Sequence, residues 1–155
     1  MKWFICANAV EYMMYASVAV STCPKDLEPI CIVDLECARR RTTCGATKVN
    51  LEKFVDTWLK WMKSHNITVI DHKVSFLDKI KQVYTGADNE KEHPYDLASG
   101  AFLRCDIPTI CEKLGFQDRY VVYTDADVFF VHHNAQHFLD LKPELLDQAL
   151  SSLLA

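Results

Sequence analysis

Two carboxylates that could bind a metal ion follow an apolar segment in the last third of the chain. Asp125 and Asp127 stand at positions i and i+2 in the segment DRYVVYTDADVFF (118–130). On an extended backbone, side chains two residues apart point to the same side. Two like charges this close are unfavourable unless a cation lies beside them, and hard divalent ions bind carboxylate oxygens. The pattern therefore predicts a Mn²⁺ or Mg²⁺ site, with a solvated turn as the simpler interpretation.

Strand-like segments that would position these carboxylates recur along the chain. Each is short, continuously apolar and rich in β-branched or aromatic residues, which is typical of parallel strands covered by helices on both faces. The predicted strands are Trp3–Ala7, Ile30–Leu35, Ile67–Ile70 and Tyr120–Thr124. The polar residues at or near their ends are Asn8, Asp34, Asp71 and Asp125. Since ligands of parallel sheets bind beyond the carboxyl ends of the strands, these positions are candidates for a site.

Helical patterns alternate with the strands. Between 51 and 62, apolar residues fall at helical spacing, which predicts an amphipathic helix with Asn50 as its N-cap. Further helices are expected over 9–21, 96–105, 108–114 and from Pro143 onward, with polar loops over 38–47 and 86–93. Strand and helix in alternation predict an α/β fold: a three-layer α/β/α sandwich with a mainly parallel sheet, in a single domain over 1–155.

Composition narrows the class of protein further. Half of the residues are hydrophobic and a quarter are charged, as in one globular domain, and the net charge of −4 argues against nucleic-acid binding by the whole domain. The seven cysteines are odd in number and form no CxxC pair, which favours free thiols in the reducing cytoplasm over disulfides or a zinc site. Glu11 interrupts the apolar N-terminal segment, so we expect a buried strand and helix there rather than a signal peptide. No apolar run reaches the ~18 residues of a membrane span, and no transmembrane segment is expected.

The segment YVVYTDADVFF (120–130) resembles the DxD motif of the GT-A glycosyltransferases, most closely the retaining family that includes glycogenin and bacterial lipopolysaccharide galactosyltransferases. The resemblance implies a Rossmann-like fold that binds a nucleotide-diphosphate sugar as the donor. It also implies that Asp125 and Asp127 are metal ligands and that Ala126, between them, contacts the donor. The upstream segment SGAFLRCDIP (99–108) is similar to a family helix whose basic residue, here Arg104, contacts the diphosphate-sugar portion of the donor.

The N-terminal segment is also similar to the first strand of that family. Asn8 stands where the family has an Asp or Thr that meets the nucleotide, and Tyr12 corresponds to a Tyr near the base. The implied activity is that of a hexosyltransferase, in which a sugar passes from a metal-bound donor, with a UDP-sugar favoured, to an unidentified hydroxyl acceptor. The mechanism implied is front-face substitution, and no residue of this chain is assigned as a catalytic nucleophile.

The chain departs from the family in two respects. It ends soon after Asp127, so the half that supplies the acceptor pocket is expected to be short or missing. It also offers no match for the distant His that completes the family's metal site. The nearest candidates are His132, His133 and His137, which an extended strand would carry away from the metal at about 3.3 Å per residue. We interpret them as loop histidines, and His65 and His72 as structural.

Other interpretations of these residues remain open. The run Arg39–Arg41 could attract an anionic ligand but is more typical of a solvated loop, and Asp71 could face the cleft. A haloacid-dehalogenase phosphatase also uses DxD, but that family wants Thr or Val where Phe129 stands. A third interpretation is an incomplete nucleotide-sugar-binding or interaction domain. It is favoured by a leucine stripe after Pro143, whose cover would come from this domain, from a missing segment or from a second subunit in a homodimer.

Overall fold

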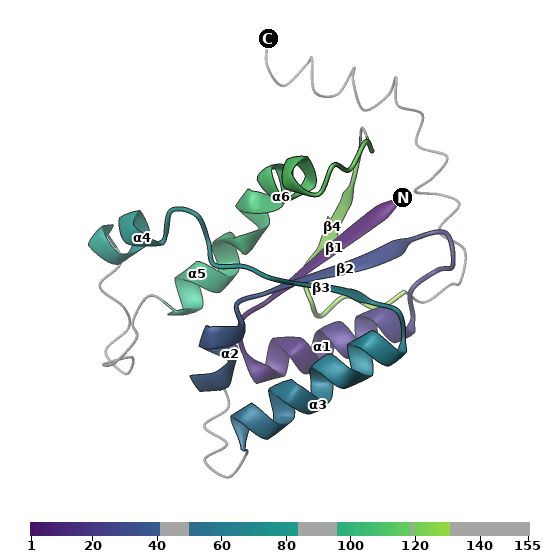
Figure 1. Ribbon diagram of the computed structural model, residues 1–155, viewed down its shortest axis with the longest axis horizontal. Coiled ribbons are helices and arrows are strands. Elements are labelled where there is room, and N and C mark those ends of the chain that lie inside the picture. Colours follow the sequence, from purple (N-terminus) through teal and green to yellow (C-terminus); the bar gives the residue numbers. More distant parts are fainter. Residues whose placement is uncertain (41–49, 84–95, 119, 131–155) are drawn as a thin grey trace.

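A computed structural model of the chain describes residues 1–40, 50–83, 96–118 and 120–130 (Figure 1). The strands are β1 (Lys2–Ala7), β2 (Glu28–Val33), β3 (Thr68–Asp71) and β4 (Val122–Thr124). The α-helices are α1 (Val10–Ser21), α2 (Leu35–Arg40), α3 (Leu51–Ser64), α4 (Leu77–Val83), α5 (Asp96–Phe102) and α6 (Ile107–Lys113), with the 3-10 helix η1 (Leu103–Asp106) between the last two. No helix in these ranges has both the length and the hydropathy needed to cross a bilayer.

The strands form one parallel sheet in the order β3-β2-β1-β4. Phe4 in the middle of β1 pairs with Ile30 of β2 on one side and with Tyr123 of β4 on the other. Parallel strands need crossover connections, and α1 and α3 supply them between β1, β2 and β3. The chain steps outward from β1 to β3 and then returns to the other side of β1 as β4, so the strand order reverses between β1 and β4.

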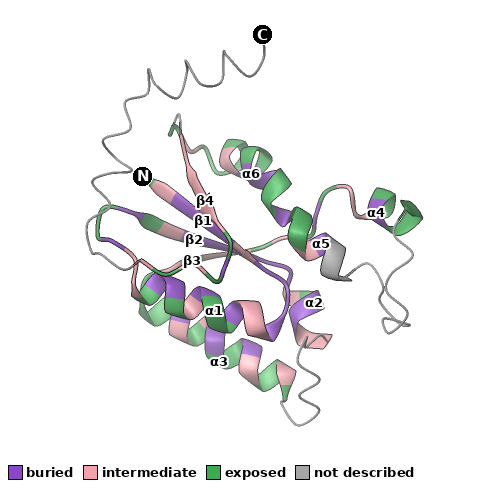
Figure 2. Cartoon of the chain, turned by 180° about the vertical axis from the view of Figure 1, so that it is seen from behind, coloured by how far each residue is buried: buried purple, intermediate pink, exposed green. Residues whose placement is uncertain are grey.

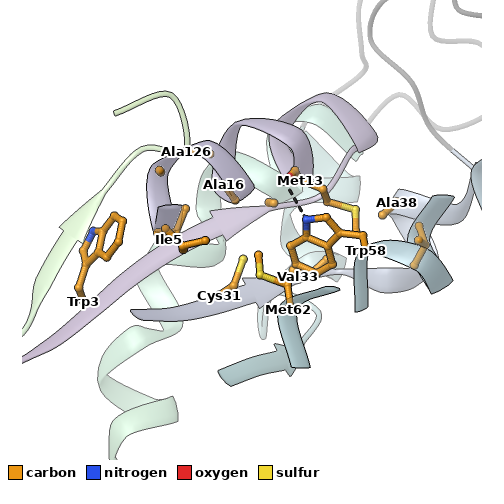
Figure 3. Packing of buried hydrophobic residues seen from close by; sticks show 14 of the residues in the cluster. Trp3, Ile5, Met13, Ala16, Cys31, Val33, Ala38, Trp58, Met62 and Ala126 are labelled. Carbon is orange, nitrogen blue, oxygen red and sulfur yellow. Dashed lines mark hydrogen bonds between the residues drawn. The ribbon is translucent and has the colours of Figure 1, made fainter. Parts of the chain in front are cut away.

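Helices cover both faces of this sheet, with α1 and α3 on one face and α5 and α6 on the other (Figures 1 and 2). Alternate residues of β1 enter the two cores: Trp3 and Ile5 pack with α1 and α3, while Phe4 packs with η1 and α6. Trp58 of α3 is buried in the first core and donates its Nε1–H to the carbonyl of Met13 in α1 at 2.9 Å (Figure 3). The two helices are therefore joined by a satisfied indole as well as by apolar contact.

The α/β fold with a parallel sheet agrees with the sequence prediction, as does the cap of α3, where the Asn50 side chain accepts from the backbone N–H of Lys53 at 2.9 Å. The second predicted strand is wrong at its end, because Leu35 begins α2. Asp34 caps that helix: its Oδ1 accepts from the Cys37 N–H at 2.9 Å. The predicted loop from 38 is wrong as far as Arg40, which lies in α2, and α4 was not predicted.

Some of the remaining sequence predictions concern residues that the structure does not describe. The cysteines that it covers are free thiols, as expected: Cys6, Cys23, Cys31, Cys37, Cys105 and Cys111. The helix predicted from Pro143, the loop over 86–93, Arg41 and the histidines at 132, 133 and 137 lie outside the described residues.

Candidate functional site

A pocket of about 300 Å³ lies at the carboxyl ends of β1 and β4, where the strand order reverses. Its lining includes every residue that the sequence assigned to the donor and metal site: Asn8, Tyr12, Arg104, Asp125, Ala126 and Asp127. It also includes residues that the sequence analysis did not select: Cys6, Gly100, Ala101 and Tyr123. The reversal point of an open parallel sheet is where such folds bind ligands, because the connections on either side leave in opposite directions and open a crevice.

Asp125 and Asp127 reach the pocket through a turn. The strand ends at Thr124, whose Oγ1 accepts from the buried Trp3 Nε1–H at 3.0 Å, so the last residue of β4 is tied to β1. Ala126 is buried in the apolar core, whereas Asp125 and Asp127 on either side of it are exposed. The backbone turns at Ala126 and Asp127, so the expectation of an extended segment there is wrong. Both carboxylates nevertheless line the same pocket, because the buried alanine anchors the turn between them.

Asp125 has two partners in the pocket wall. The Tyr123 hydroxyl donates to Asp125 Oδ1 at 2.6 Å, and Arg104 Nη1 lies 3.6 Å from the same oxygen. The guanidinium carbon of Arg104 also lies 5.9 Å from the centre of the Tyr123 ring. Burial of Tyr123, together with its hydrogen bond to Asp125, raises the pKa of the phenol well above its usual range. The neighbouring Tyr123 hydroxyl also raises the pKa of Arg104, so both groups keep their protons.

Asn8 and Gly100 lie against each other in the lining of the pocket. Asn8 follows β1 and is buried, and Gly100 lies in α5. A Cβ placed on Gly100 would lie 2.1–2.3 Å from the Nδ2, Cγ and Oδ1 atoms of Asn8, a separation that no real contact allows. A side chain at position 100 would therefore displace the Asn8 side chain, and the glycine leaves room for it beside α5. A glycine inside a helix costs about 1 kcal/mol relative to alanine, and that cost was the signal in the sequence that could have revealed this position.

Cys6 also lines the pocket but is not suited to nucleophilic chemistry. Burial raises the pKa of its thiol to about 12, so the group stays protonated at neutral pH. A reactive cysteine needs the opposite shift, since the thiolate is the nucleophile. Cys6 is therefore part of the pocket wall.

A second polar cluster, around Asp106 at the end of η1, lies outside the pocket. Its Oδ2 lies 2.8 Å from His72 Nε2 and accepts from the Ser75 N–H at 2.6 Å, while its Oδ1 accepts from the Ser75 hydroxyl at 2.6 Å. Burial would raise the pKa of Asp106, but the bonds from Ser75 and His72 outweigh it and lower the pKa below its usual value. The cluster ties the segment after β3 to the start of α6, which fits the structural role expected for His72.

The other polar candidates are engaged elsewhere. Asp71 is exposed and its Oδ1 accepts from the Leu35 N–H at 3.2 Å, so it supports the start of α2 and does not line the pocket. Arg39 pairs with Asp56 at 2.8 Å and Arg40 with Glu36 at 2.9 Å. These arginines lie in α2 with acidic partners rather than in a loop that guides an anionic ligand.

The donor set of the pocket suits a hard divalent cation that keeps part of its hydration. Asp125 and Asp127 offer carboxylate oxygens, the ligands that Mg²⁺ and Mn²⁺ prefer. Within the ranges that the structure describes, no group of three or more His, Cys, Asp or Glu side chains is placed to hold a metal ion. Two protein ligands would leave the remaining positions to water and to oxygens of a bound phosphate, which is the usual arrangement for Mg²⁺.

No protein-family model, curated protein or solved structure matches the chain. The function is therefore inferred from the pocket and from the chemistry of the residues that line it.

Proposed function

We propose that the chain binds a nucleotide-diphosphate sugar, with a UDP-sugar favoured, through a Mn²⁺ or Mg²⁺ ion on Asp125 and Asp127, and acts as a GT-A-type glycosyltransferase. One observation carries the proposal. Residues chosen from three distant parts of the sequence, at 8–12, at 104 and at 125–127, converge on one pocket at the reversal point of a parallel sheet. The order β3-β2-β1-β4 is also that of the first strands of a doubly wound nucleotide-binding sheet.

The lining of the pocket divides into parts that suit the parts of such a donor. Asp125, Asp127 and Arg104 line the pocket, and Arg104 lies beside Asp125, where a metal ion would neutralise charge on the diphosphate. The Arg104 guanidinium adds a second positive group with the planar geometry that phosphate oxygens accept. Asn8 can hydrogen-bond a uracil or ribose edge, and the Tyr12 ring offers a face on which a base can stack. A pocket of about 300 Å³ lies at the lower end of the range for small-molecule sites.

Binding without transfer is the second candidate function. Of the described residues that line the pocket, the only carboxylates are the two assigned to the metal, and the Cys6 thiol stays protonated. A sugar nucleotide could therefore be held in a domain whose catalytic groups are incomplete. The two functions share the donor site and differ only in turnover.

Calorimetric titration of the purified chain with UDP tests the shared site. We expect UDP to bind in the presence of Mn²⁺ and to lose its affinity in EDTA, with GDP binding more weakly. Asp127→Asn should lower the affinity for UDP at fixed Mn²⁺ by about tenfold or more, because it removes one charged metal ligand. Asp118→Asn is the matched control, since it removes the same charge from an exposed position outside the pocket. Metal-independent binding would contradict the metal assignment, and absence of binding by either nucleotide would overturn the proposal.

Turnover then separates the two candidates. For a transferase, the wild type with Mn²⁺ should release UDP from UDP-glucose or UDP-galactose, since such enzymes also pass the sugar to water, and Asp127→Asn should release much less. UDP binding without any release of UDP from either donor would favour the binding domain.

A further inference from the structure

Three side chains at the mouth of the pocket form a small charge network. The Tyr123 hydroxyl donates to Asp125 Oδ1 at 2.6 Å, and Arg104 Nη1 lies 3.6 Å from that same oxygen. The side chains of Arg104 and Asp125 are 48% and 67% exposed, so their ion pair is in contact with solvent. Tyr123 is half-buried, and its ring lies beneath the guanidinium.

The two contacts differ in strength. The hydrogen bond from Tyr123 is short and comes from a side chain held in the wall of the pocket, so it fixes the orientation of the carboxylate. The ion pair with Arg104 is long and exposed, and such pairs contribute little because solvent screens them and both side chains lose freedom. Arg104 can therefore leave Asp125 at small cost, while Tyr123 holds the carboxylate in place.

Arg104 and a metal ion compete for the same carboxylate. Among the described residues, both contacts of Asp125 fall on Oδ1, and Oδ2 remains able to accept an ion. A divalent cation there would lie within a few ångströms of the guanidinium, where the repulsion between the two positive charges is appreciable even in water. The pocket therefore binds a metal ion weakly when no diphosphate is present. A diphosphate changes this balance, because its oxygens can accept both the metal and Arg104.

We propose that Arg104 is a latch: it neutralises Asp125 in the empty pocket and moves to the diphosphate when metal and nucleotide bind together. The inference rests on the proposed function, since it concerns the same site. Its consequence is that metal and nucleotide bind with positive coupling, and the coupling is reciprocal by thermodynamic necessity. A residue that only contacts diphosphate would strengthen nucleotide binding without any effect on the amount of metal required.

The test is Arg104→Met, which keeps the length of the side chain and removes its charge. UDP binding is followed by calorimetry while Mn²⁺ is raised and UDP is held well below its Kd, so that the Mn²⁺ concentration for half-maximal binding reports the affinity for the metal; this concentration is compared with that of the wild type. The latch predicts that this concentration falls roughly three- to tenfold in Arg104→Met, because repulsion of the cation is lost. The affinity for UDP at saturating Mn²⁺ should fall about tenfold, because a contact to the diphosphate is lost.

Two further variants separate the latch from general charge effects. Arg39→Met removes one positive charge at a residue that pairs with Asp56 and does not line the pocket. Arg39→Met should leave both the Mn²⁺ concentration for half-maximal binding and the affinity for UDP at saturating Mn²⁺ unchanged within about twofold. Tyr123→Phe keeps the ring and removes the hydrogen bond to Asp125, so the carboxylate loses its fixed orientation and the Mn²⁺ requirement should rise a few fold.

The outcomes are distinct from those that test the function itself. If wild-type protein binds no UDP with Mn²⁺, the proposed function fails. If it does bind, and Arg104→Met leaves the Mn²⁺ requirement unchanged or raises it, the latch is overturned while the donor site stands. If the Mn²⁺ requirement fell equally in Arg39→Met, the latch would also be overturned, because the effect would then come from net charge.

Discussion

Two polar clusters in this fold differ in burial and in hydrogen bonding: one surrounds Asp106, and the other contains Asp125 and Asp127. Asp106 is only 4% exposed and receives hydrogen bonds from Ser75 and His72 on both of its oxygens. Asp125 and Asp127 are exposed at the edge of the sheet, and with the described residues Asp125 makes one hydrogen bond and one long ion pair. The first carboxylate joins segments of the chain, whereas the second pair faces an open pocket.

This comparison shows that burial and hydrogen bonding together decide whether a carboxylate stabilises the fold or is available to a ligand. A buried carboxylate whose oxygens are hydrogen-bonded stabilises the fold. Removal of the carboxylate or of its donors leaves buried polar groups without a hydrogen bond. Exposed carboxylates at a reversal point cost little to leave partly unpaired, because water solvates them until a ligand binds. The two clusters should therefore respond in opposite ways to substitution: stability changes in one and ligand affinity in the other.

The largest effect on stability is expected for Asp106→Ala. This variant leaves the Ser75 N–H, the Ser75 hydroxyl and the His72 ring without their acceptor, which should cost roughly 3 kcal/mol of the free energy of unfolding. Asp127→Ala should change that free energy by less than about 0.5 kcal/mol, since the residue is exposed. Urea unfolding of both variants measures the contrast, and similar values for the two would remove the distinction between the clusters.

The pH dependence of stability sharpens the same contrast. The pKa of Asp106 is lowered in the fold, so its contribution to stability is present above its ordinary pKa and is lost as the pH falls toward the folded value. The difference in unfolding free energy between wild type and Asp106→Asn should therefore shrink below about pH 4. Burial raises the pKa of Asp34, so its contribution has the opposite sign, being greatest at low pH and lost as the pH rises through the folded value. For each variant, the difference in unfolding free energy from wild type is measured as a function of pH. If this difference changed with pH in the same direction for Asp34→Asn and Asp106→Asn, these assignments would be wrong.

Two glycine variants test whether the pocket depends on the close approach of α5. Gly100→Ala should displace the Asn8 side chain, lower the affinity for UDP with Mn²⁺ about tenfold and cost about 1–3 kcal/mol of stability. Gly115→Ala has open space around it but a φ of +66°, so it should cost about 1 kcal/mol and leave UDP binding unchanged. Calorimetry and thermal unfolding of both variants give the comparison. Equal affinities in the two would mean that Asn8 has no part in binding.

The smallest effect is expected for Cys6→Ala. Because its thiol stays protonated, Cys6 should contribute packing and no chemistry, and UDP affinity with Mn²⁺ should stay within about twofold of wild type. In the same titration, the UDP affinity of Asp127→Asn should be lower than that of the wild type by tenfold or more. A large loss of turnover in Cys6→Ala with unchanged binding would contradict the assignment of Cys6 to the pocket wall.

The predictions from sequence were most accurate where the signal is local. The strands and the amphipathic helix α3 follow from the spacing of apolar residues over a few turns, and the Asn50 cap follows from one residue type. The short helices α2 and α4 were not predicted, because a helix of six or seven residues carries little periodicity. Asp34 was misjudged for the same reason: at a strand end it resembled a ligand, and in the fold it caps α2. The equally short α6 was predicted, since Pro108 near its start and Gly115 after its end mark its bounds.

The alternation of strands and helices, and the residue types and spacing of the candidate site, can be inferred from the amino-acid sequence alone. The pairing of β4 with β1, which brings Asn8, Arg104 and Asp125 to one pocket, is a property of the folded chain. The positions of Gly100 against Asn8 and of Asp106 beside His72 and Ser75 are also properties of the folded chain. The physical reason is that local periodicity specifies elements. Contacts between residues tens of positions apart depend on which strands pair and which faces they bury, and packing over the whole domain sets that choice.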